Sequence, residues 1–162
     1  LTMKVIVIGP SLSGKTTVIR QLCLITEIPV SEMDEELTKL NKGSYPTESE
    51  YKQKALAPKV IDRILNKENI LFFTNTDYFS VDDLVTAKLK GFEIIQLVLD
   101  FEKLMKRNEQ RVKNEGYEDL SKWFRGMLKY QEILREKGLV DKIIQADQPV
   151  TNIVKEILKT LS

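Results

Sequence analysis

Residues 3–16 read MKVIVIGPSLSGKT, and the expected fold follows from this segment. Its first half, residues 3–8, is a short apolar run rich in β-branched side chains, which predicts a parallel strand buried on both faces. Its second half, residues 9–16, contains two glycines followed by Lys-Thr and predicts a loop. Residues 16–25 then carry apolar side chains at helical spacing, so we expect a strand, a loop and a helix in that order. The expected core contacts of this helix are Val18, Ile19, Leu22 and Ile25.

The loop has the pattern Gly-x4-Gly-Lys-Thr, and each fixed position has a physical role in binding phosphate. Gly9 and Gly14 allow backbone conformations that side chains forbid and let amides approach phosphate oxygens. Successive N–H groups and the positive end of the following helix form an anion site. The ammonium of Lys15 can bridge the β- and γ-phosphates of a nucleoside triphosphate, and the hydroxyl of Thr16 can bind magnesium. The predicted nucleotide contacts of the loop are Gly9, Pro10, Ser11, Leu12, Ser13, Gly14, Lys15, Thr16 and Thr17.

The composition limits the class of protein. A chain of 162 residues is the size of one domain, and no repeat, low-complexity tract or linker divides it, so we expect a single domain over residues 1–162. The formal net charge of +1 does not favour a long nucleic acid or an anionic membrane as partner, although it leaves a local basic patch open. No apolar run reaches the roughly 20 residues needed to cross a bilayer, and the N-terminus shows no signal-peptide pattern. We therefore expect a cytoplasmic protein, monomeric or homodimeric.

Two scarce residue types restrict the chemistry. The sequence has no histidine, which excludes histidine metal ligands and general bases, so a proton acceptor must be a carboxylate or another group. The single cysteine, Cys23, excludes an internal disulfide and a cysteine-based zinc site. Because Cys23 lies among Leu22, Leu24 and Ile25, we expect a buried, unreactive thiol.

Beyond residue 25, strands and helices alternate. The expected strands are residues 28–31, 70–74, 94–99 and 142–145. The expected helices are residues 34–40, 48–65, 80–91, 102–113, 120–137 and 151–161. Pro58 is expected to kink or divide the second of these helices. The alternation predicts an α/β fold in three layers, with a five-stranded parallel sheet covered by helices on both faces.

Two arginines lie on one face of the predicted helix that follows the fourth strand. Arg107 and Arg111 are four residues apart, so their guanidinium groups can converge on one anionic target, such as a phosphoryl group in transfer. They can equally lie on a solvated helix face on which they pair with Glu102, Glu109 or Glu115.

The next predicted helix offers one charged candidate and several apolar side chains. Arg125 is a further candidate for contact with a substrate. Its apolar neighbours are expected to pack rather than to form a cofactor site. These neighbours are Trp123, Phe124, Leu128 and Leu134.

Together these features resemble the adenylate kinase-like group of P-loop small-molecule kinases, along nearly the whole chain but specifically only in patches. Residues 30–34 (VSEMD) fall where those kinases place a strand that ends in an aspartate facing the acceptor, and the matching aspartate is Asp34. Residues 97–100 (LVLD), followed by the arginine pair, look like their fourth strand and the helix that leads to the lid. Residues 146–150 (ADQPV) are similar to the loop whose backbone borders the adenine.

The resemblance implies that ATP and Mg²⁺ are the cofactors and that the fold is that of a P-loop NTPase with a short helical lid. The lid would lie at about residues 107–125 and the acceptor-binding region at about residues 32–65. Arg111 would reach the phosphates. The residues that the resemblance places around the adenine are Arg107, Asp147, Gln148 and Pro149.

Several features depart from the pattern of adenylate kinases. Leu37 stands where an arginine grips the phosphate of the acceptor, and Asp77 stands where a second arginine would lie. Phe73 replaces the strand-end aspartate that supports magnesium, and the long lid segment is missing. The loss of both arginines argues against a nucleoside monophosphate as acceptor, because Asp77 would repel a phosphate and could instead accept hydrogen bonds from hydroxyl groups.

Asp34 is the candidate for accepting the proton of the acceptor's hydroxyl group and orienting it. Asp34 could instead cap the helix that follows it, and Asn75 and Asp77 could be turn residues rather than substrate contacts. The predicted catalytic residues are Lys15, Asp34, Arg107 and Arg111. The predicted acceptor contacts are Asp34, Asn75, Asp77 and Arg125, and the predicted metal ligand is Thr16.

The sequence thus predicts an ATP-dependent phosphotransferase that acts on a nucleoside, a sugar or a similar hydroxyl-bearing acceptor. A nucleoside monophosphate kinase stays open, with Lys52, Lys54, Lys59 and Arg63 in place of the lost arginines. Two more functions also stay open. The protein could be a module that binds or slowly hydrolyses ATP without a small acceptor, or an enzyme that phosphorylates the end of a nucleic acid.

Overall fold

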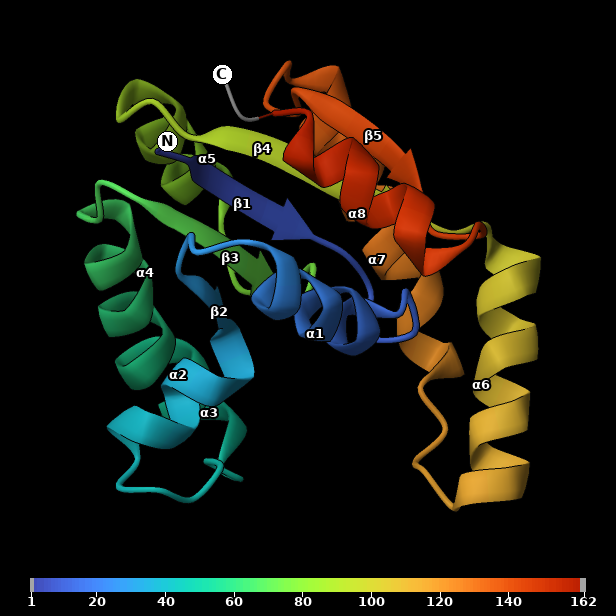
Figure 1. The fold of residues 1–162 in the computed structure, drawn as a ribbon. Helices are drawn as coiled ribbons and strands as arrows, with labels where there is room; N and C mark the ends of the chain where they lie inside the picture. Colours follow the sequence, from blue (N-terminus) through green and yellow to red (C-terminus); the bar gives the residue numbers. More distant parts are fainter. Residues whose placement is uncertain (1, 161–162) are drawn as a thin grey trace.

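The computed structural model describes residues 2–160, in which five strands alternate with helices (Figure 1). The strands are β1 Lys4–Ile8, β2 Val30–Glu32, β3 Ile70–Thr74, β4 Glu93–Val98 and β5 Lys142–Gln145. The α-helices are α1 Lys15–Ile25, α2 Met33–Leu40, α3 Ser49–Tyr51, α4 Ala57–Leu65, α5 Val81–Leu89, α6 Phe101–Glu115, α7 Phe124–Glu136 and α8 Val150–Leu158. Two shorter stretches are the π-helical η1 Lys52–Leu56 and the 3₁₀-helical η2 Ser121–Trp123. None of the described helices is long and apolar enough to span a membrane.

The sheet has the strand order β2-β3-β1-β4-β5, and all neighbouring strands are parallel. β1 lies at the centre, where Val7 pairs with Phe73 of β3 on one side and with Ile95 of β4 on the other. The chain therefore winds from β1 to one side of the sheet before it crosses to the other. In open parallel sheets, ligands bind at the carboxyl ends of the strands where the winding reverses. The loop 9–14 follows β1 at this point.

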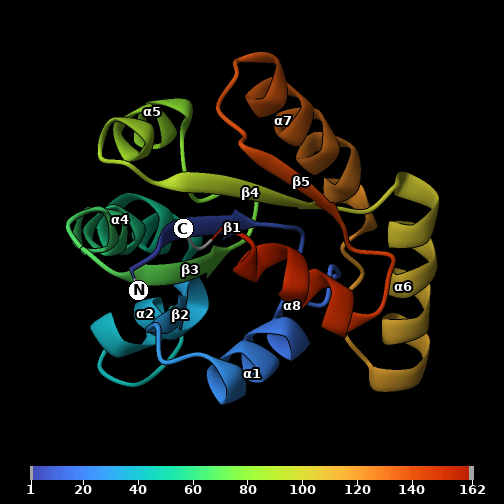
Figure 2. The ribbon, with the colours of Figure 1, turned by 45° about the horizontal axis from the view of Figure 1, so that its top comes forward.

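Alternate residues of β1 face the two helical layers. Val5 and Val7 pack in one core with residues of α1, α6 and α8, whereas Ile6 and Ile8 pack in a second core with residues of α2, α4 and α5. Figure 2 shows α1 and α8 on one face of the sheet and α5 and α7 on the other. Every side chain of β3 is buried, as a strand covered on both faces requires. The predicted three-layer α/β fold with a five-stranded parallel sheet is confirmed.

Capping residues and one proline set the helix boundaries. Ser80 caps α5 and forms a capping box with Asp83, while the Asp100 carboxylate caps α6. α6 ends where Gly116 adopts a φ of 69°, so this helix is two residues longer at its C-terminus than expected. The second predicted helix continues without a break but contains the π-helical η1 directly before α4, where Pro58 lies in the first turn and lacks the N–H group that a regular helix would use.

The last turn of α1 lies outside the core, contrary to expectation. Val18 and Leu22 are buried and Ile19 is half-buried, but Ile25 is 60% exposed and Cys23 is exposed as well. Successive residues of a helix are turned by about 100°, so Cys23 points away from the side that buries Leu22. Ile25 is the last residue of the helix and lies beyond the buried stripe. The predictions of a core contact at Ile25 and of a buried thiol were therefore wrong.

At position 9, the first residue after β1, glycine is required because a side chain would collide with its neighbours, not because of the backbone conformation. Gly14 has a φ of 83°, in the left-handed region that favours glycine, whereas Gly9 does not have a positive φ. A Cβ atom at Gly9 would lie 2.8 Å from the Oγ of Ser13 and 2.9 Å from the Cβ of Leu97. Of the two glycines, therefore, only Gly14 adopts the backbone conformation that we expected of both. Gly9 instead allows β1, the loop and β4 to approach one another closely.

We expect Gly9→Ala to lower the free energy of unfolding by about 1–3 kcal/mol, because the added methyl group overpacks the junction of loop and sheet. Gly126→Ala is the matched control, since this glycine lies in α7 with open space around its Cβ position. There alanine should raise stability by about 0.5–1 kcal/mol through its higher helix propensity. Urea unfolding followed by circular dichroism measures both variants, and equal effects at the two positions would contradict the close approach at Gly9.

Candidate active site

The side chain of Lys15 is buried at the start of α1 and folds back over the loop before it. Its Nζ donates hydrogen bonds to the carbonyl oxygens of Gly9 at 2.7 Å and Pro10 at 2.9 Å, and the residue is only 6% exposed. Burial lowers the pKa of the Lys15 ammonium to about 8, and the negative charges of carboxylates oppose this shift. These carboxylates belong to Glu32, Asp34 and Asp77. Lys15 therefore lies in a desolvated and acidic setting at the carboxyl edge of the sheet.

The loop between β1 and α1 is held by its own hydrogen bonds. The N–H group and the hydroxyl of Ser13 both donate to the carbonyl oxygen of Pro10, at 2.9 and 2.6 Å. The N–H group of Gly9 donates to the carbonyl oxygen of Thr74 in β3 at 3.1 Å, which ties the loop to the sheet. Thr16 follows in the first turn of α1 and is exposed. The loop is thus rigidly connected to β3, while the predicted metal ligand is open to solvent.

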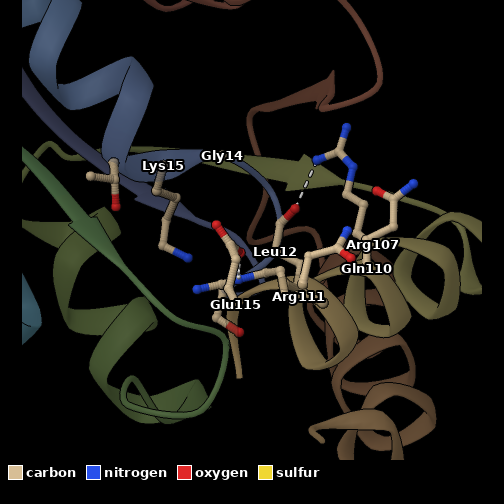
Figure 3. A pocket seen from close by; sticks show the side chains of 10 residues that line it. Leu12, Gly14, Lys15, Arg107, Gln110, Arg111 and Glu115 are labelled. Atoms are coloured by element: carbon tan, nitrogen blue, oxygen red, sulfur yellow. Dashed lines mark hydrogen bonds and ion pairs between the residues drawn. The ribbon is translucent and has the colours of Figure 1, made fainter. Parts of the chain in front are cut away.

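A cavity of about 520 Å³ lies between this loop and α6. Figure 3 shows Arg107, Gln110 and Arg111 extending from α6 toward the segment that carries Leu12 and Lys15. The residues that line the cavity are Ser11, Leu12, Gly14, Lys15, Thr16, Arg107, Gln110, Arg111, Asn114 and Glu115. The structure therefore brings the predicted arginine pair beside the loop, although the two are more than 90 residues apart in the sequence.

Arg107 connects the loop to the segment that follows β5. Its guanidinium donates to the carbonyl oxygen of Leu12 at 2.7 Å and to that of Ala146 at 3.4 Å. The Asp147 carboxylate accepts a hydrogen bond from Lys103, which lowers the pKa of this carboxyl group. Arg107 and residues 146–149 are thus adjacent, as the resemblance implied, but the Asp147 side chain is already paired with another residue.

The sequence left open whether Arg111 faces a phosphate site or pairs with a nearby glutamate, and its position fits both. It faces the cavity beside the loop, and it also forms an ion pair with Glu115 in which Nε lies 3.8 Å from Oε2. Its guanidinium lies over the ring of Tyr117, 4.1 Å from the ring centre, and both residues line an adjoining cavity of about 230 Å³. In this structure, therefore, Arg111 is held by its neighbours at the mouth of the cavity.

Asp34 lies in the first turn of α2 and does not cap it, since the N-cap residue is Glu32. Burial raises the pKa of the Asp34 carboxyl group, while the positive charges of Lys15 and Lys52 lower it. The hydroxyl of Tyr45 donates to Oδ1 of Asp34 at a distance of 3.5 Å. The capping interpretation of Asp34 is therefore not supported, and the carboxylate lies between two ammonium groups.

Sequence reasoning did not single out Glu32, the last residue of β2. Burial raises the pKa of its carboxyl group, and the charge of Asp34 raises it further, while Lys15 acts in the opposite direction. The signal in the sequence was the pattern Glu-x-Asp at the end of a strand, because a carboxylate at the carboxyl edge of a parallel sheet faces the ligand site. Glu32 and Asp34 together form the acidic side of this site.

A second cavity, of about 710 Å³, lies on the other side of the loop; we call it the aromatic cavity. Its lining residues are Ser11, Ser49, Lys52, Gln53, Asn75, Thr76, Asp77, Tyr78, Phe79, Ser80, Leu120, Trp123, Gly126, Met127 and Tyr130. Two predicted acceptor contacts, Asn75 and Asp77, are among them. Asp34 is not, but the hydroxyl of Tyr45 contacts both its carboxylate and the hydroxyl of Tyr78, which does line the cavity.

The region before and within α7 differs from the expectation at two positions. The guanidinium of Arg125 lies over the ring of Phe101, 4.4 Å from its centre, and Arg125 does not line the aromatic cavity. Trp123 is 57% exposed and lines that cavity, contrary to the expectation that its role is packing. Its position in the short η2, before the regular turns of α7, leaves the indole at the surface. Phe124 and Leu134 are buried, as expected.

The side chains present are compatible with magnesium bound together with phosphate. Within residues 2–160 there is no cluster of three acidic, cysteine or histidine side chains that could hold a metal ion by itself. Mg²⁺ does not need one, because it keeps several waters and binds phosphate oxygens with one or two protein ligands. Thr16 lines the cavity beside the loop, and Glu32 and Asp34 act on the adjacent Lys15. Phe73 is fully buried and offers no ligand.

Comparisons with known proteins identify the fold. No protein-family model matches the sequence, and no curated protein matches it. Among solved structures, shikimate kinase from Acinetobacter baumannii in complex with shikimate has a TM-score of 0.76 at 18% identity, covering 99% of this chain and 93% of that chain. Shikimate kinase from Aquifex aeolicus has a TM-score of 0.73 at 24% identity, covering 98% and 96%. A gluconokinase from Sinorhizobium meliloti has a TM-score of 0.63 at 19% identity, covering 97% and 90%.

These likenesses show that the chain has the fold of P-loop small-molecule kinases of the adenylate kinase-like group. The resemblance drawn from residues 30–34, 97–100 and 146–150 is thereby confirmed at the level of the fold. At such identities the fold is all that the comparisons establish, and the roles of individual side chains must be argued from the geometry of the site.

We expect the protein to gain stability relative to Lys15→Met as the pH rises from about 8 to about 10.5. The folded pKa of about 8 lies below the ordinary value of 10.5, so in this range the unfolded chain binds more protons than the folded one. The gain should be on the order of 1–3 kcal/mol. Urea unfolding of both proteins between pH 7 and 11 measures it, because titrations common to both cancel. A stability difference that is constant over this range would rule out a buried ammonium with a lowered pKa.

Proposed function

We propose that the protein is an ATP-dependent phosphotransferase that moves the γ-phosphate of ATP to a hydroxyl group of a small acceptor. The observation that carries this proposal is the position of Ser11, which borders both the cavity beside α6 and the aromatic cavity. A phosphate donor in the first cavity and an acceptor in the second would therefore meet at the same loop. The fold that the chain shares with shikimate kinases and a gluconokinase supports this arrangement.

The donor site would consist of the loop, the start of α1 and α6. Backbone N–H groups of the loop and the positive end of α1 bind the phosphates. Lys15 exchanges its hydrogen bonds to two loop carbonyls for bonds to the β- and γ-phosphates. Arg107 and the segment 146–149 border the adenine, and Arg111 leaves Glu115 to reach the phosphates. Thr16 would hold Mg²⁺ together with the phosphates, and the ion would supply positive charge against the charge that develops during transfer.

The acceptor would bind in the aromatic cavity, with its reacting hydroxyl directed at Asp34. Asp34 takes the proton, the hydroxyl oxygen forms a bond to the γ-phosphorus, and the bond from that phosphorus to the β–γ bridging oxygen breaks, so that ADP leaves. Burial raises the pKa of Asp34, which makes its carboxylate a stronger base than a solvated aspartate. The rest of catalysis is alignment of the two substrates and neutralisation of charge.

The domain and lid boundaries are part of the same proposal. Residues 1–162 form one kinase domain, residues 32–65 contribute the acceptor side and residues 107–125 act as the lid. Figure 1 shows α6 at the edge of the molecule toward which the strands point, which is where a lid over the loop would lie. Closure would bring Arg111 onto the phosphates and exclude water from the transfer. The small-molecule acceptor is the proposed partner, and the cytoplasm is the proposed location.

The cavity lining does not favour a nucleoside monophosphate as acceptor. Of the four basic residues that could have replaced the lost arginines, only Lys52 lines the aromatic cavity. Lys54 is paired with Glu50 at 2.9 Å on the exposed side of the helix. A module that binds ATP without a small acceptor is the second candidate, because the buried Phe73 near the end of β3 offers no magnesium ligand and Arg111 is paired with Glu115.

We expect one class of acceptor to accelerate ATP consumption in the presence of magnesium, and Lys15→Ala to reduce that acceleration about 100-fold or more. The panel contains nucleosides, nucleoside monophosphates, sugars and short oligonucleotides, and ADP formation is the measured quantity. If ATP binds but no acceptor changes the rate, the proposal fails in favour of the ATP-binding module.

We expect Asp34→Asn to lower kcat by about 10²–10⁴-fold, since the amide cannot take the proton, while the Kd for ATP changes little. Because burial raises the pKa of Asp34, activity of the unmodified protein should fall on the acid side at a pH above the ordinary range for aspartate. Glu35→Gln is the control, because Glu35 lies next to Asp34 but pairs with Lys39 on the exposed side. An equal loss in both variants would show that Asp34 has no specific role.

A further inference from the structure

The positive charge in the aromatic cavity is already engaged. Lys52 is the only cation among the side chains that line the cavity in the described part of the chain. Its Nζ donates to the hydroxyl of Tyr45 at 3.1 Å and lies over the rings of Tyr45 and Tyr78, 5.3 and 5.8 Å from their centres. Its charge also acts on the carboxylate of Asp34. A ligand with a phosphate or carboxylate would therefore compete with the carboxylate of Asp34 and the two tyrosine rings for the charge of Lys52.

Two groups in the same lining lack partners. The carboxylate of Asp77 is exposed at the cavity, and within residues 2–160 it forms neither an ion pair nor a hydrogen bond. The hydroxyl of Thr76, the next residue toward β3, is buried and is the only such buried side-chain atom without a hydrogen bond in the described chain. Both groups can accept hydrogen bonds, and buried polar groups normally have partners. Asp77 can therefore accept hydrogen bonds from a ligand and repels a ligand that is anionic, while the hydroxyl of Thr76 can either donate or accept one.

Aromatic side chains form another part of the lining. Tyr78, Phe79, Trp123 and Tyr130 contribute to it, and most of the lining surface is apolar. The hydroxyl of Tyr130 donates to the carbonyl oxygen of Phe79 at 2.6 Å, which fixes one of these rings. Trp123, in contrast, leaves more than half of its surface to solvent. An exposed indole at the edge of a cavity offers a face for stacking on another aromatic ring.

Given the proposed phosphotransferase, on which this inference rests, we propose that its acceptor is a nucleoside. The hydroxyls of the sugar donate to Asp77, and the base lies against Trp123. A nucleoside carries no phosphate and therefore needs no counter-ion from Lys52, whose charge already interacts with Tyr45, Tyr78 and Asp34. Transfer converts the nucleoside and ATP into a nucleoside monophosphate and ADP, with release of the hydroxyl proton. A volume of about 710 Å³ is within the usual range for a site of this kind, about 300–1,000 Å³.

The single tryptophan of the chain allows a test by binding alone. Because Trp123 is the only tryptophan and lines the cavity, its fluorescence reports on ligands there without ATP or turnover. We expect a saturable change with at least one of the common nucleosides. The corresponding nucleoside monophosphate, shikimate and gluconate should bind about tenfold more weakly or worse, because each carries an anionic group. Equal or tighter binding of any of these three, or no saturable change with any nucleoside, overturns the proposal.

Variants separate the two halves of the site. Asp77→Asn should weaken nucleoside binding about tenfold or more, because a charged acceptor of hydrogen bonds is lost. The same change should reduce the difference between the Kd for the nucleoside and the Kd for its monophosphate. Asp82→Asn is the matched control, since it removes the same charge from the nearby exposed surface of α5 and should leave both affinities unchanged. Trp123→Leu should weaken the binding of nucleosides more than the binding of ribose, as measured by calorimetry.

Failure of this inference and failure of the proposed function give different results. Nucleoside binding is measured on the unmodified protein without ATP, and phosphorylation is measured separately with ATP and Mg²⁺. Nucleoside binding without phosphorylation in the unmodified protein would uphold the ligand class and refute the phosphotransferase. Phosphorylation of an anionic acceptor, without nucleoside binding, would uphold the phosphotransferase and refute the nucleoside.

Discussion

The burial of one ammonium group, that of Lys15, is the constraint on which the rest of the site depends. A charged amine can be buried only if hydrogen bonds and opposite charges replace water. Two loop carbonyls accept its hydrogen bonds, and three carboxylates at the ends of β2 and β3 or just beyond oppose the loss of its proton. The tight loop that presents those carbonyls requires Gly9, where a Cβ atom would collide with Ser13 and Leu97. One charge therefore links the loop, the sheet and the acidic side of the cavity.

The parallel sheet explains why residues from five separate segments gather at the edge of the sheet that carries this charge. All strands end at the same edge, so the segments that follow them converge there. The loop follows β1, the Glu-x-Asp pair ends β2, Asn75 and Asp77 follow β3, α6 follows β4 and residues 146–149 follow β5. Each segment can change without altering the core, because the two cores are made by the strands and the inner faces of the helices.

The two sides of the loop differ in how closely they follow the pattern of known kinases. The proposed donor side keeps the phosphate loop, Arg107 of α6 and the segment after β5 in contact. The proposed acceptor side has around one cavity an engaged Lys52, an exposed Trp123 and an Asp77 that is unpaired within the described residues 2–160. A P-loop scaffold can keep its phosphate chemistry while the acceptor side changes, since specificity resides in the few side chains that touch the second substrate.

The sequence alone determined the five strands, their parallel arrangement and the phosphate loop, because these follow from local periodicity and from spacing along the chain. The spacing of Arg107 and Arg111 left a solvated helix face open, and only the resemblance to P-loop kinases implied that they lie near the loop. Only the tertiary structure decided that Cys23 and Ile25 are exposed, that Arg125 lies over Phe101 and that Trp123 borders a cavity. It also brought Tyr45, Lys52 and Tyr78 together beside Asp34. Apolar and charged side chains are read from a sequence by their period, but whether another segment covers a given helix turn depends on contacts between residues far apart in the chain.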